Sequence, residues 1–268
     1  DASGVYALNY NFPKVFDSVV VVTDVIGFVN SQKVTIISGS LNCKLGGKQS
    51  PVLKDGESIF KSVNALYKPL GTYNSQGVPN YLTPTNDPID ASMINDINAT
   101  LPESIPLTTS HPAYFNSTNE KNLVLTEACD VWVTFVHEGA GYKNVLGFYK
   151  FNTNNPPATA AAIDTVFIIF PNVSFSGSGG GLASGNRVYL GAFPPGTELG
   201  WVLIADGFRN STITNGNWVL YSDDYLNPET QASKKQHAIL LNDIGRGKFL
   251  LGFEDIRRDQ ASDNDFND

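Results

Sequence analysis

After Asn122 the chain is a series of short apolar runs, and this pattern restricts the fold more than any other feature. Nine runs rich in Val, Ile, Leu and aromatic residues are separated by Gly, Pro, Asn or Asp. Short strands at this spacing are typical of an antiparallel sandwich or barrel. We predict an all-β fold, a jelly-roll-like β-sandwich. The predicted strands are 123–125, 131–136, 145–151, 165–175, 187–193, 199–204, 218–221, 238–241 and 248–253.

The sequence of residues 1–122 predicts fewer strands, a few short helices and long loops. Runs rich in Val and Ile at 18–25 and 33–38 read as strands on either side of a turn at 27–32. Helices are predicted at 58–67 and at 91–99, the second with Asp90 as its N-cap. Polar loops are expected at 68–88 and 101–119. We expect residues 1–122 to pack on the same sandwich as residues 123–268, in one continuous domain.

Charge and composition exclude some partners. The net charge is −8 and the pI is near 4.8, which argues against nucleic acids and anionic membrane surfaces. No apolar run approaches the length of a bilayer span. The chain begins at Asp1, and its single methionine is Met93, so we expect a signal peptide to have been removed. These features predict a secreted or cell-surface protein.

Cysteines and glycosylation motifs add little. Cys43 and Cys129 are a possible disulfide in an oxidising compartment, and two buried thiols are the alternative. N-x-S/T motifs are possible glycosylation sites in a secreted protein, but the composition alone predicts about as many of them. They lie at Asn98, Asn116, Asn172 and Asn210.

The last sixteen residues carry a dense acidic run directly after a predicted strand. Asp263, Asp265 and Asn267 stand at alternate positions, as in the opening of an EF-hand calcium loop, although Asp268 replaces the glycine that follows there. A solvated acidic tail is the alternative. The interleaved Phe253 and Phe266 favour a folded loop, because apolar side chains are costly to leave in water. We predict a strand that leads into an oxygen-rich loop binding Ca²⁺.

A second segment, 135–144, has the same character, with glycines beside Glu138 that allow a tight turn. The segment 221–228 is the third of this kind. Carboxylate, carboxamide and carbonyl oxygens are the ligands that Ca²⁺ collects. The predicted metal ligands are Glu138, Asn144, Glu254, Asp255, Asp263, Asp265, Asn267 and Asp268.

These motifs resemble the LruC-type domain family of bacterial secreted and cell-surface proteins. The resemblance extends from about Gly71 to the end and is carried by residues 126–149, 221–229, 236–237 and 251–268. It implies an extracellular, calcium-dependent β-sandwich, often found in large adhesin-like proteins. Carried over position by position, the acidic signature of the family falls on Glu254, Asp255, Asp263, Asp265, Asn267 and Asp268.

Three functions follow from the sequence. The first is a non-enzymatic, calcium-binding structural or adhesive protein, a possible subunit of a surface assembly or filament, whose partners are its own copies, other surface proteins or glycans. The second is a carbohydrate-binding module in which Trp218, Tyr221 and Tyr225 stack on sugar rings. The third is a glycoside hydrolase with Glu138 and Glu254 as its carboxylate pair. It ranks last, because metal binding explains the acids around Glu254 better.

Overall fold

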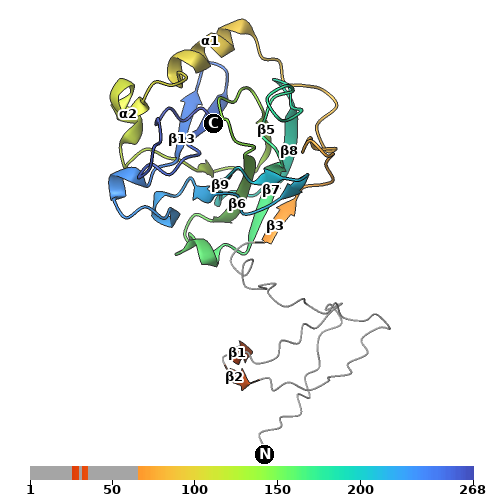
Figure 1. The fold of residues 1–268 in the computed structure, drawn as a ribbon, viewed down its shortest axis with the longest axis vertical. Helices are drawn as coiled ribbons and strands as arrows, with labels where there is room; N and C mark the ends of the chain where they lie inside the picture. Colours follow the sequence, from red (N-terminus) through yellow and green to blue (C-terminus); the bar gives the residue numbers. More distant parts are fainter. Residues whose placement is uncertain (1–25, 30–31, 36–65) are drawn as a thin grey trace, which may run out of the picture. The chain divides into compact units, whose positions relative to one another are not determined.

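The computed structural model describes residues 26–29, 32–35 and 66–268, and the chain divides into two units, residues 1–58 and 59–268. In the first unit β1 (Ile26–Val29) pairs with β2 (Gln32–Thr35) as an antiparallel hairpin (Figure 1). The turn predicted over 27–32 is therefore wrong for residues 27–29 and for Gln32, which lie in β1 and β2. The run predicted at 18–25 lies outside the described residues. Residue 122 falls inside the second unit, and one continuous domain over residues 1–268 stays a prediction.

A six-stranded sheet forms the centre of the second unit (Figure 1). Its strands follow the order β12–β9–β6–β7–β3, and β4 also pairs with β9. The pairing of β3 with β7 is parallel, and the others are antiparallel. The bounds are β3 (Leu66–Pro69), β4 (Leu123–Leu125), β6 (Val145–Asn152), β7 (Thr165–Phe170), β9 (Thr197–Ala205) and β12 (Trp218–Tyr221).

β3 corrects the first predicted helix. Leu66 and Tyr67, the end of the helix predicted at 58–67, pair with β7 as a strand, and the rest of that prediction lies outside the described residues. Pairing with a sheet edge outweighs the weak local preference for a helix. The second predicted helix is confirmed as α1 (Ala91–Thr100), where the Asp90 side chain accepts a hydrogen bond from the Met93 N–H at 2.8 Å.

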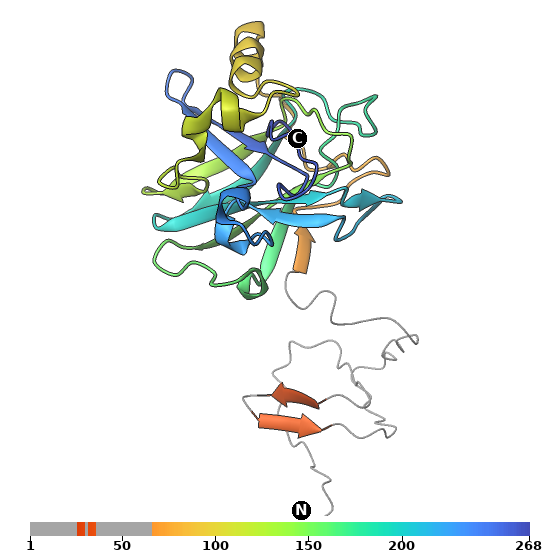
Figure 2. The same cartoon turned by 60° about the vertical axis from the view of Figure 1, so that its left-hand side comes forward.

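Two antiparallel ladders cover one face of the central sheet (Figure 2). β5 (Cys129–Thr134) pairs with β8 (Arg187–Phe193), and β13 (Ala238–Asp243) pairs with β14 (Lys248–Phe253). The main core lies between the layers, where Trp201 and Leu203 of β9 are in one cluster with Val131 of β5 and Phe253 of β14. A second cluster, with Tyr149, Val202 and Tyr221, includes residues of the same central strands.

The all-β class is confirmed. The jelly-roll-like sandwich stays a prediction, because the covering strands form separate two-stranded ladders. The remaining described strands, β10 (Phe208–Arg209) and β11 (Thr212–Ile213), form a small hairpin. None of the helices described in residues 66–268 has the length and apolar composition of a membrane span. Besides α1 they are α2 (Leu107–Ser110), η2 (Pro112–Phe115), η3 (Ala160–Ala162), η4 (Asp224–Leu226) and η5 (Ala232–Lys234).

A third apolar cluster fixes the C-terminal residues on the β13–β14 hairpin. Phe266 is fully buried and packs with Leu101, Leu107 and Ile239. The Leu107 N–H donates to the Asn264 carbonyl at 2.8 Å, which ties α2 to the same segment. The acidic run is therefore a folded loop, and the solvated-tail alternative is wrong.

Candidate metal centre

Three carboxylates from the acidic run meet at the end of β14. Glu254 follows the last residue of that strand, and Asp265 and Asp268 come from the C-terminal segment. One oxygen from each of the three side chains lies within 4.8 Å of the others. We call these three residues the acidic cluster.

Part of the acidic cluster lacks hydrogen-bond partners among the described residues. Glu254 is 0% exposed, and neither of its carboxylate oxygens has a hydrogen bond of ordinary geometry among the described residues, although the Ser262 hydroxyl opposes the rise of its pKa. One oxygen of Asp265 is also buried without a partner there. A buried carboxylate without donors is costly, because it has lost its hydration and gained nothing in return. Such a group needs a proton or a cation.

Burial and mutual repulsion change the acidities accordingly. Burial, together with the negative charge of Asp263, raises the pKa of Glu254 to about 8. Burial also raises the pKa of Asp265, and it raises that of Asp268, where the neighbouring Asp255 adds to the effect. In the absence of a cation the cluster therefore holds protons well above the ordinary range of carboxylic acids.

Backbone N–H groups position the two aspartates of the acidic cluster. The Ser104 N–H donates to Asp265 Oδ2 at 2.8 Å, and the Asp255 N–H donates to Asp268 Oδ2 at 2.9 Å. The Asp268 N–H in turn donates to the Phe253 carbonyl at 3.2 Å. These bonds use one oxygen of each aspartate and fix the direction of the other.

The loop reaches this geometry through left-handed residues. Asn264 has a φ of 62° and Phe266 a φ of 60°, which is rare for a bulky side chain. Burial of the Phe266 ring and the Arg258 guanidinium, 5.4 Å from the centre of that ring, hold this conformation. Arg258 Nε also donates to Asn264 Oδ1 at 2.8 Å. The loop of alternate acids is thus folded back on itself rather than extended.

Asp255 and Asn144 lie beside the cluster in a supporting position. Asn144 is fully buried, and its Nδ2 donates to Asp255 Oδ2 at 2.8 Å, while its Oδ1 accepts from the Asp206 N–H at 2.9 Å. Because both ends of the Asn144 amide are already bonded, it orients Asp255. The structure shows Asn144 holding Asp255, and its predicted role as a metal ligand stays a prediction.

Asn267 lies at the edge of the cluster, next to a residue that sequence reasoning missed. Its Nδ2 donates to Glu103 Oε2 at 2.9 Å, and its Oδ1 is buried without a partner among the described residues. Glu103 lies in the loop after α1, more than 160 positions away in the sequence. Gly139 leaves room here, since a Cβ there would be 2.2 Å from Glu103 Oε2. Asp263 is exposed and acts on the cluster by its charge.

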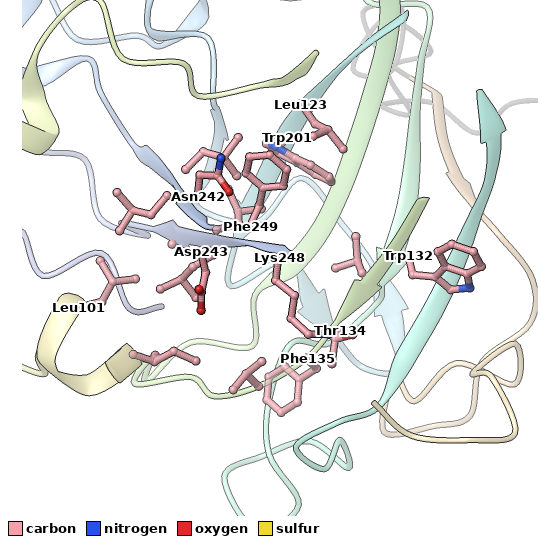
Figure 3. Close-up of a pocket in the computed structure, with 18 of the residues that line it drawn as sticks. Leu101, Leu123, Trp132, Thr134, Phe135, Trp201, Asn242, Asp243, Lys248 and Phe249 are labelled. Atoms are coloured by element: carbon pink, nitrogen blue, oxygen red, sulfur yellow. The ribbon is translucent and has the colours of Figure 1, made fainter. Parts of the chain in front are cut away.

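Glu138 has a different partner from the one predicted. Its Oε1 accepts from the Phe175 N–H at 3.2 Å, and the side chain is not among the carboxylates of the acidic cluster. Its Oε2 is buried without a partner among the described residues. A cavity of about 1160 Å³ is lined by β5 and β14 (Figure 3), and neither Glu138 nor Glu254 lines it. A glycosidase pair of Glu138 and Glu254 stays a hypothesis.

His237 contacts the backbone of Glu254, the first residue of the acidic cluster. Its Nδ1 contacts the Glu254 carbonyl oxygen at 2.9 Å, and its Nε2 contacts Glu229 Oε1 at 3.0 Å. All three residues are buried. His237 therefore links the backbone of the first cluster residue to the segment that follows β12.

The other predicted site residues are dispersed. Tyr221 packs in the second core cluster and offers no face to a glycan, which corrects its predicted stacking role. Trp218 is half-buried under the Arg257 guanidinium, and Tyr225 is exposed and donates to the Pro157 carbonyl at 3.0 Å.

The predicted glycosylation and disulfide residues differ in their exposure. Asn172 is buried, and its Nδ2 donates to the carbonyls of Gln76 and Gly179, so it cannot accept a glycan. Asn98, Asn116 and Asn210 are exposed. Cys129 is exposed at the start of β5, and Cys43 lies outside the described residues, so their pairing stays a prediction.

The donor set fits a hard divalent cation. The cluster offers only oxygen atoms, without a cysteine or histidine side chain within the group, which favours Ca²⁺ or Mg²⁺ over Zn²⁺. Ca²⁺ binds oxygen at about 2.4 Å, so two ligands on opposite sides of one ion are separated by about 4.8 Å. The unpartnered oxygens of Glu254 and Asp265 are the observation that supports this fit.

Comparison with known proteins gives one match. Residues 193–268 match the model of a family described as a domain of unknown function, DUF4114. This region contains the β13–β14 hairpin and the whole acidic cluster. No curated protein and no solved structure matched the chain. The C-terminal part of the chain, including the candidate metal centre, is therefore similar to the DUF4114 domain.

Proposed function

We propose that the acidic cluster binds Ca²⁺ and that the ion fastens the C-terminal loop to the end of β14. The observation that carries this proposal is Glu254, a fully buried carboxylate with both oxygens unpartnered beside Asp265 and Asp268. Three carboxylates carry more negative charge than one divalent ion neutralises. The site therefore keeps a net negative charge when the ion is bound. Neutral ligands, such as water and Asn267 Oδ1, complete the coordination without adding to that charge.

The role of the ion is structural. Phe266 and backbone hydrogen bonds hold Asp265 and Asp268 in place beside the end of β14, and Glu254 and Asp265 do not line the neighbouring cavity of about 1160 Å³, which of the three only Asp268 reaches. Together with the resemblance to LruC-type domains, this supports a non-enzymatic calcium-binding domain of a secreted or cell-surface protein, with an adhesive or assembly role.

Calorimetric titration of chelator-treated protein tests the proposal. We expect Ca²⁺ to bind with a stoichiometry near one and with higher affinity than Mg²⁺, because Mg²⁺ requires a smaller octahedral site. Glu254→Gln should abolish the binding heat, whereas Glu198→Gln, a carboxylate bonded to Asn122, should leave it unchanged. Equal binding by Glu254→Gln and the wild type would reject the site.

A carbohydrate-binding role is the second candidate, supported at a different place from the one predicted. Trp132 and Tyr189 are 46% and 45% exposed on β5 and β8, with ring centres 5.2 Å apart. Adjacent exposed aromatic rings offer faces for sugar stacking. A glycan array should show hits that Trp132→Ala removes and Trp218→Ala retains. An array without hits would dismiss this role.

A further inference from the structure

Asn267 has an amide side chain whose two ends lie in different surroundings. Its Nδ2 donates to Glu103 Oε2 at 2.9 Å, whereas its Oδ1 is buried without a partner among the described residues. The nitrogen and the oxygen of an amide are nearly the same in size, so half a turn of the side chain exchanges them. The hydrogen-bond partners of Asn267 therefore decide which of the two atoms is left for a cation.

Glu103 holds this amide in one orientation. An ionised carboxylate only accepts hydrogen bonds, and an amide nitrogen only donates them. Turning the amide round would place Asn267 Oδ1 against Glu103 Oε2, so that two acceptors would repel each other and the bond at 2.9 Å would be lost. With Nδ2 held in this way, Oδ1 is the end of the amide that stays free.

The backbone around the two residues is fixed without this bond. The Gly139 N–H donates to the Asn267 carbonyl at 3.2 Å. The Ser104 N–H, next to Glu103, donates to Asp265 Oδ2 at 2.8 Å, which brings the loop after α1 to the acidic cluster. The rotation of the Asn267 side chain is therefore the freedom that the bond to Glu103 removes.

Gly139 provides the space for the contact. A Cβ at this position would be 2.2 Å from Glu103 Oε2 and 2.6 Å from Asn267 Oδ1, closer than side-chain atoms approach each other. The carboxylate and the amide therefore meet over a residue without a side chain. Glu103 and Asn267 also line the cavity of about 1160 Å³ in Figure 3, together with Asp268 of the acidic cluster. The contact thus lies on the side of the site that faces this cavity.

A fixed neutral oxygen suits the site. Glu254, Asp265 and Asp268 already offer three carboxylates to one divalent ion. Ca²⁺ takes about six to eight oxygen ligands, among them amide carbonyls and water. An amide oxygen raises the number of ligands without further repulsion between charges. An NH₂ group in the same place would instead direct its hydrogen atoms at the cation.

We propose that Glu103 is a positioning residue of the candidate metal centre. It holds Asn267 Nδ2, so that Asn267 presents Oδ1 to the ion as a neutral ligand. This inference rests on the proposed Ca²⁺ site and adds to it a residue from a distant segment. Partners that orient metal ligands in this way are common in metalloproteins. Glu103 lies outside residues 193–268, the part of the chain that is similar to the DUF4114 domain.

Glu103→Gln and Glu103→Met test this role by calorimetric titration of the chelator-treated full chain with Ca²⁺. Both changes remove the charge, but Gln keeps a carbonyl oxygen that accepts from Asn267 Nδ2, and Met has only a weakly accepting sulfur. We expect Glu103→Met to weaken Ca²⁺ binding at least about tenfold and Glu103→Gln less than about threefold. Equal effects of the two variants would mean that Glu103 acts through its charge alone, which overturns the proposal.

An Asn267→Asp background separates orientation from support of the fold. Both ends of an aspartate side chain are oxygens, so its orientation no longer needs a partner. In this background Glu103→Met and Glu103→Gln should bind Ca²⁺ within about twofold of each other. A tenfold difference that persists there would show that Glu103 acts by another route than the Asn267 amide, against the proposal.

Gly139→Ala approaches the same contact from the other side. The added methyl group would displace the flexible end of Glu103 and break its bond to Asn267. Gly141→Ala is the matched control in the same segment, because a Cβ there meets nothing within 4 Å. Gly139→Ala should weaken Ca²⁺ binding at least about fivefold, and Gly141→Ala should leave it unchanged. Binding by Gly139→Ala as tight as that of the wild type would show that the contact is not needed.

Failure of the positioning role is distinguishable from failure of the metal site. Wild-type protein that binds no Ca²⁺ removes the site and the role of Glu103 together. Wild-type protein that binds Ca²⁺ no more tightly than Glu103→Met leaves the site in place and removes the positioning role alone. Thermal melting adds a second readout. Glu103→Met should reduce the rise in melting temperature that Ca²⁺ causes, whereas an equal loss of stability in Ca²⁺ and in chelator would mean a purely structural residue.

Discussion

Two groups of acidic residues lie in this molecule, the acidic cluster after β14 and a group after β12 around Asp223. In the second group Tyr149 Oη donates to Asp223 Oδ2, and Asn122 Nδ2 donates to Asp223 Oδ1 at 3.1 Å and to Glu198 Oε1 at 2.8 Å. Asp224 pairs with Lys121 at 3.1 Å. Each acid of this group therefore has at least one donor from the protein, although Asp224 Oδ1 is buried without a partner among the described residues.

The acidic cluster differs at Glu254. Both oxygens of Glu254 are buried without a donor among the described residues, whereas one oxygen of Asp265 is in the same state as Asp224 Oδ1 of the second group. Both groups come from segments rich in acids and amides, so the density of such residues does not separate them. What separates them is a carboxylate with no donor on either oxygen, which is Glu254, and only a structure shows this.

The largest expected effect is that of calcium removal. If Ca²⁺ supplies the charge that the acidic cluster lacks, a chelator should lower the melting temperature by about 10 °C at saturating ion, the shift for a ligand present at about a thousand times its Kd. Differential scanning calorimetry with Ca²⁺ add-back checks this. Identical melting in Ca²⁺ and in chelator would remove the contrast between the two groups.

Substitution of one residue in each group should give opposite dependence on calcium. Glu254→Gln removes a buried charge, so it should lose the stabilisation by Ca²⁺ but unfold no more easily than the wild type in chelator at pH 8. Tyr149→Phe keeps the ring and removes the donor to Asp223, so it should cost about 1–3 kcal/mol in both conditions. Urea unfolding measures both variants.

A result in which both variants respond alike to Ca²⁺ would contradict this comparison. So would a Glu254→Gln variant that is unstable in chelator as well as in Ca²⁺, because the carboxylate would then have a protein partner that the structure does not contain.

The effect of pH should change sign between the calcium-free and the calcium-bound protein. Burial raises the pKa of Glu254 from 4.5 to about 8, so the folded state binds this proton more tightly than the unfolded state. Its contribution to stability is complete below pH 4.5 and is lost as the pH rises to about 8. Without Ca²⁺ the protein should therefore become less stable over this range, and Glu254→Gln should flatten the curve.

With Ca²⁺ the sign changes, because the ion and the proton compete for the same oxygens. The calcium affinity should increase from pH 5 toward pH 8 and level off above the pKa of Glu254, which titration at several pH values would measure. An affinity independent of pH would mean that the ion binds elsewhere.

The local pattern predicted much of the fold and a part of the site. Alternating apolar runs predicted the all-β class, and the acids after residues 248–253 indicated where Glu254, Asp265 and Asp268 meet. The pattern did not indicate Glu103 or the Ser104 N–H, because these groups join the site through the packing of Leu101, Leu107 and Phe266. Asn144 matched the predicted chemistry but is used internally, since Asp255 and the Asp206 N–H occupy its amide.

The smallest expected effect distinguishes a residue that binds the ion directly from one that acts on the site only through its charge. Asp263 is exposed and acts on Glu254 through its charge, so Asp263→Asn should weaken Ca²⁺ binding by about two- to fivefold at low salt. Because solvent-exposed charges are screened, the difference from the wild type should almost vanish at about 0.5 M salt. Asp265→Asn should weaken binding more strongly at both salt concentrations, since it alters an oxygen of the cluster itself. If Asp263→Asn proves as damaging as Asp265→Asn regardless of salt, Asp263 is a direct ligand, and the loop closes more tightly around the ion than its exposed side chain indicates.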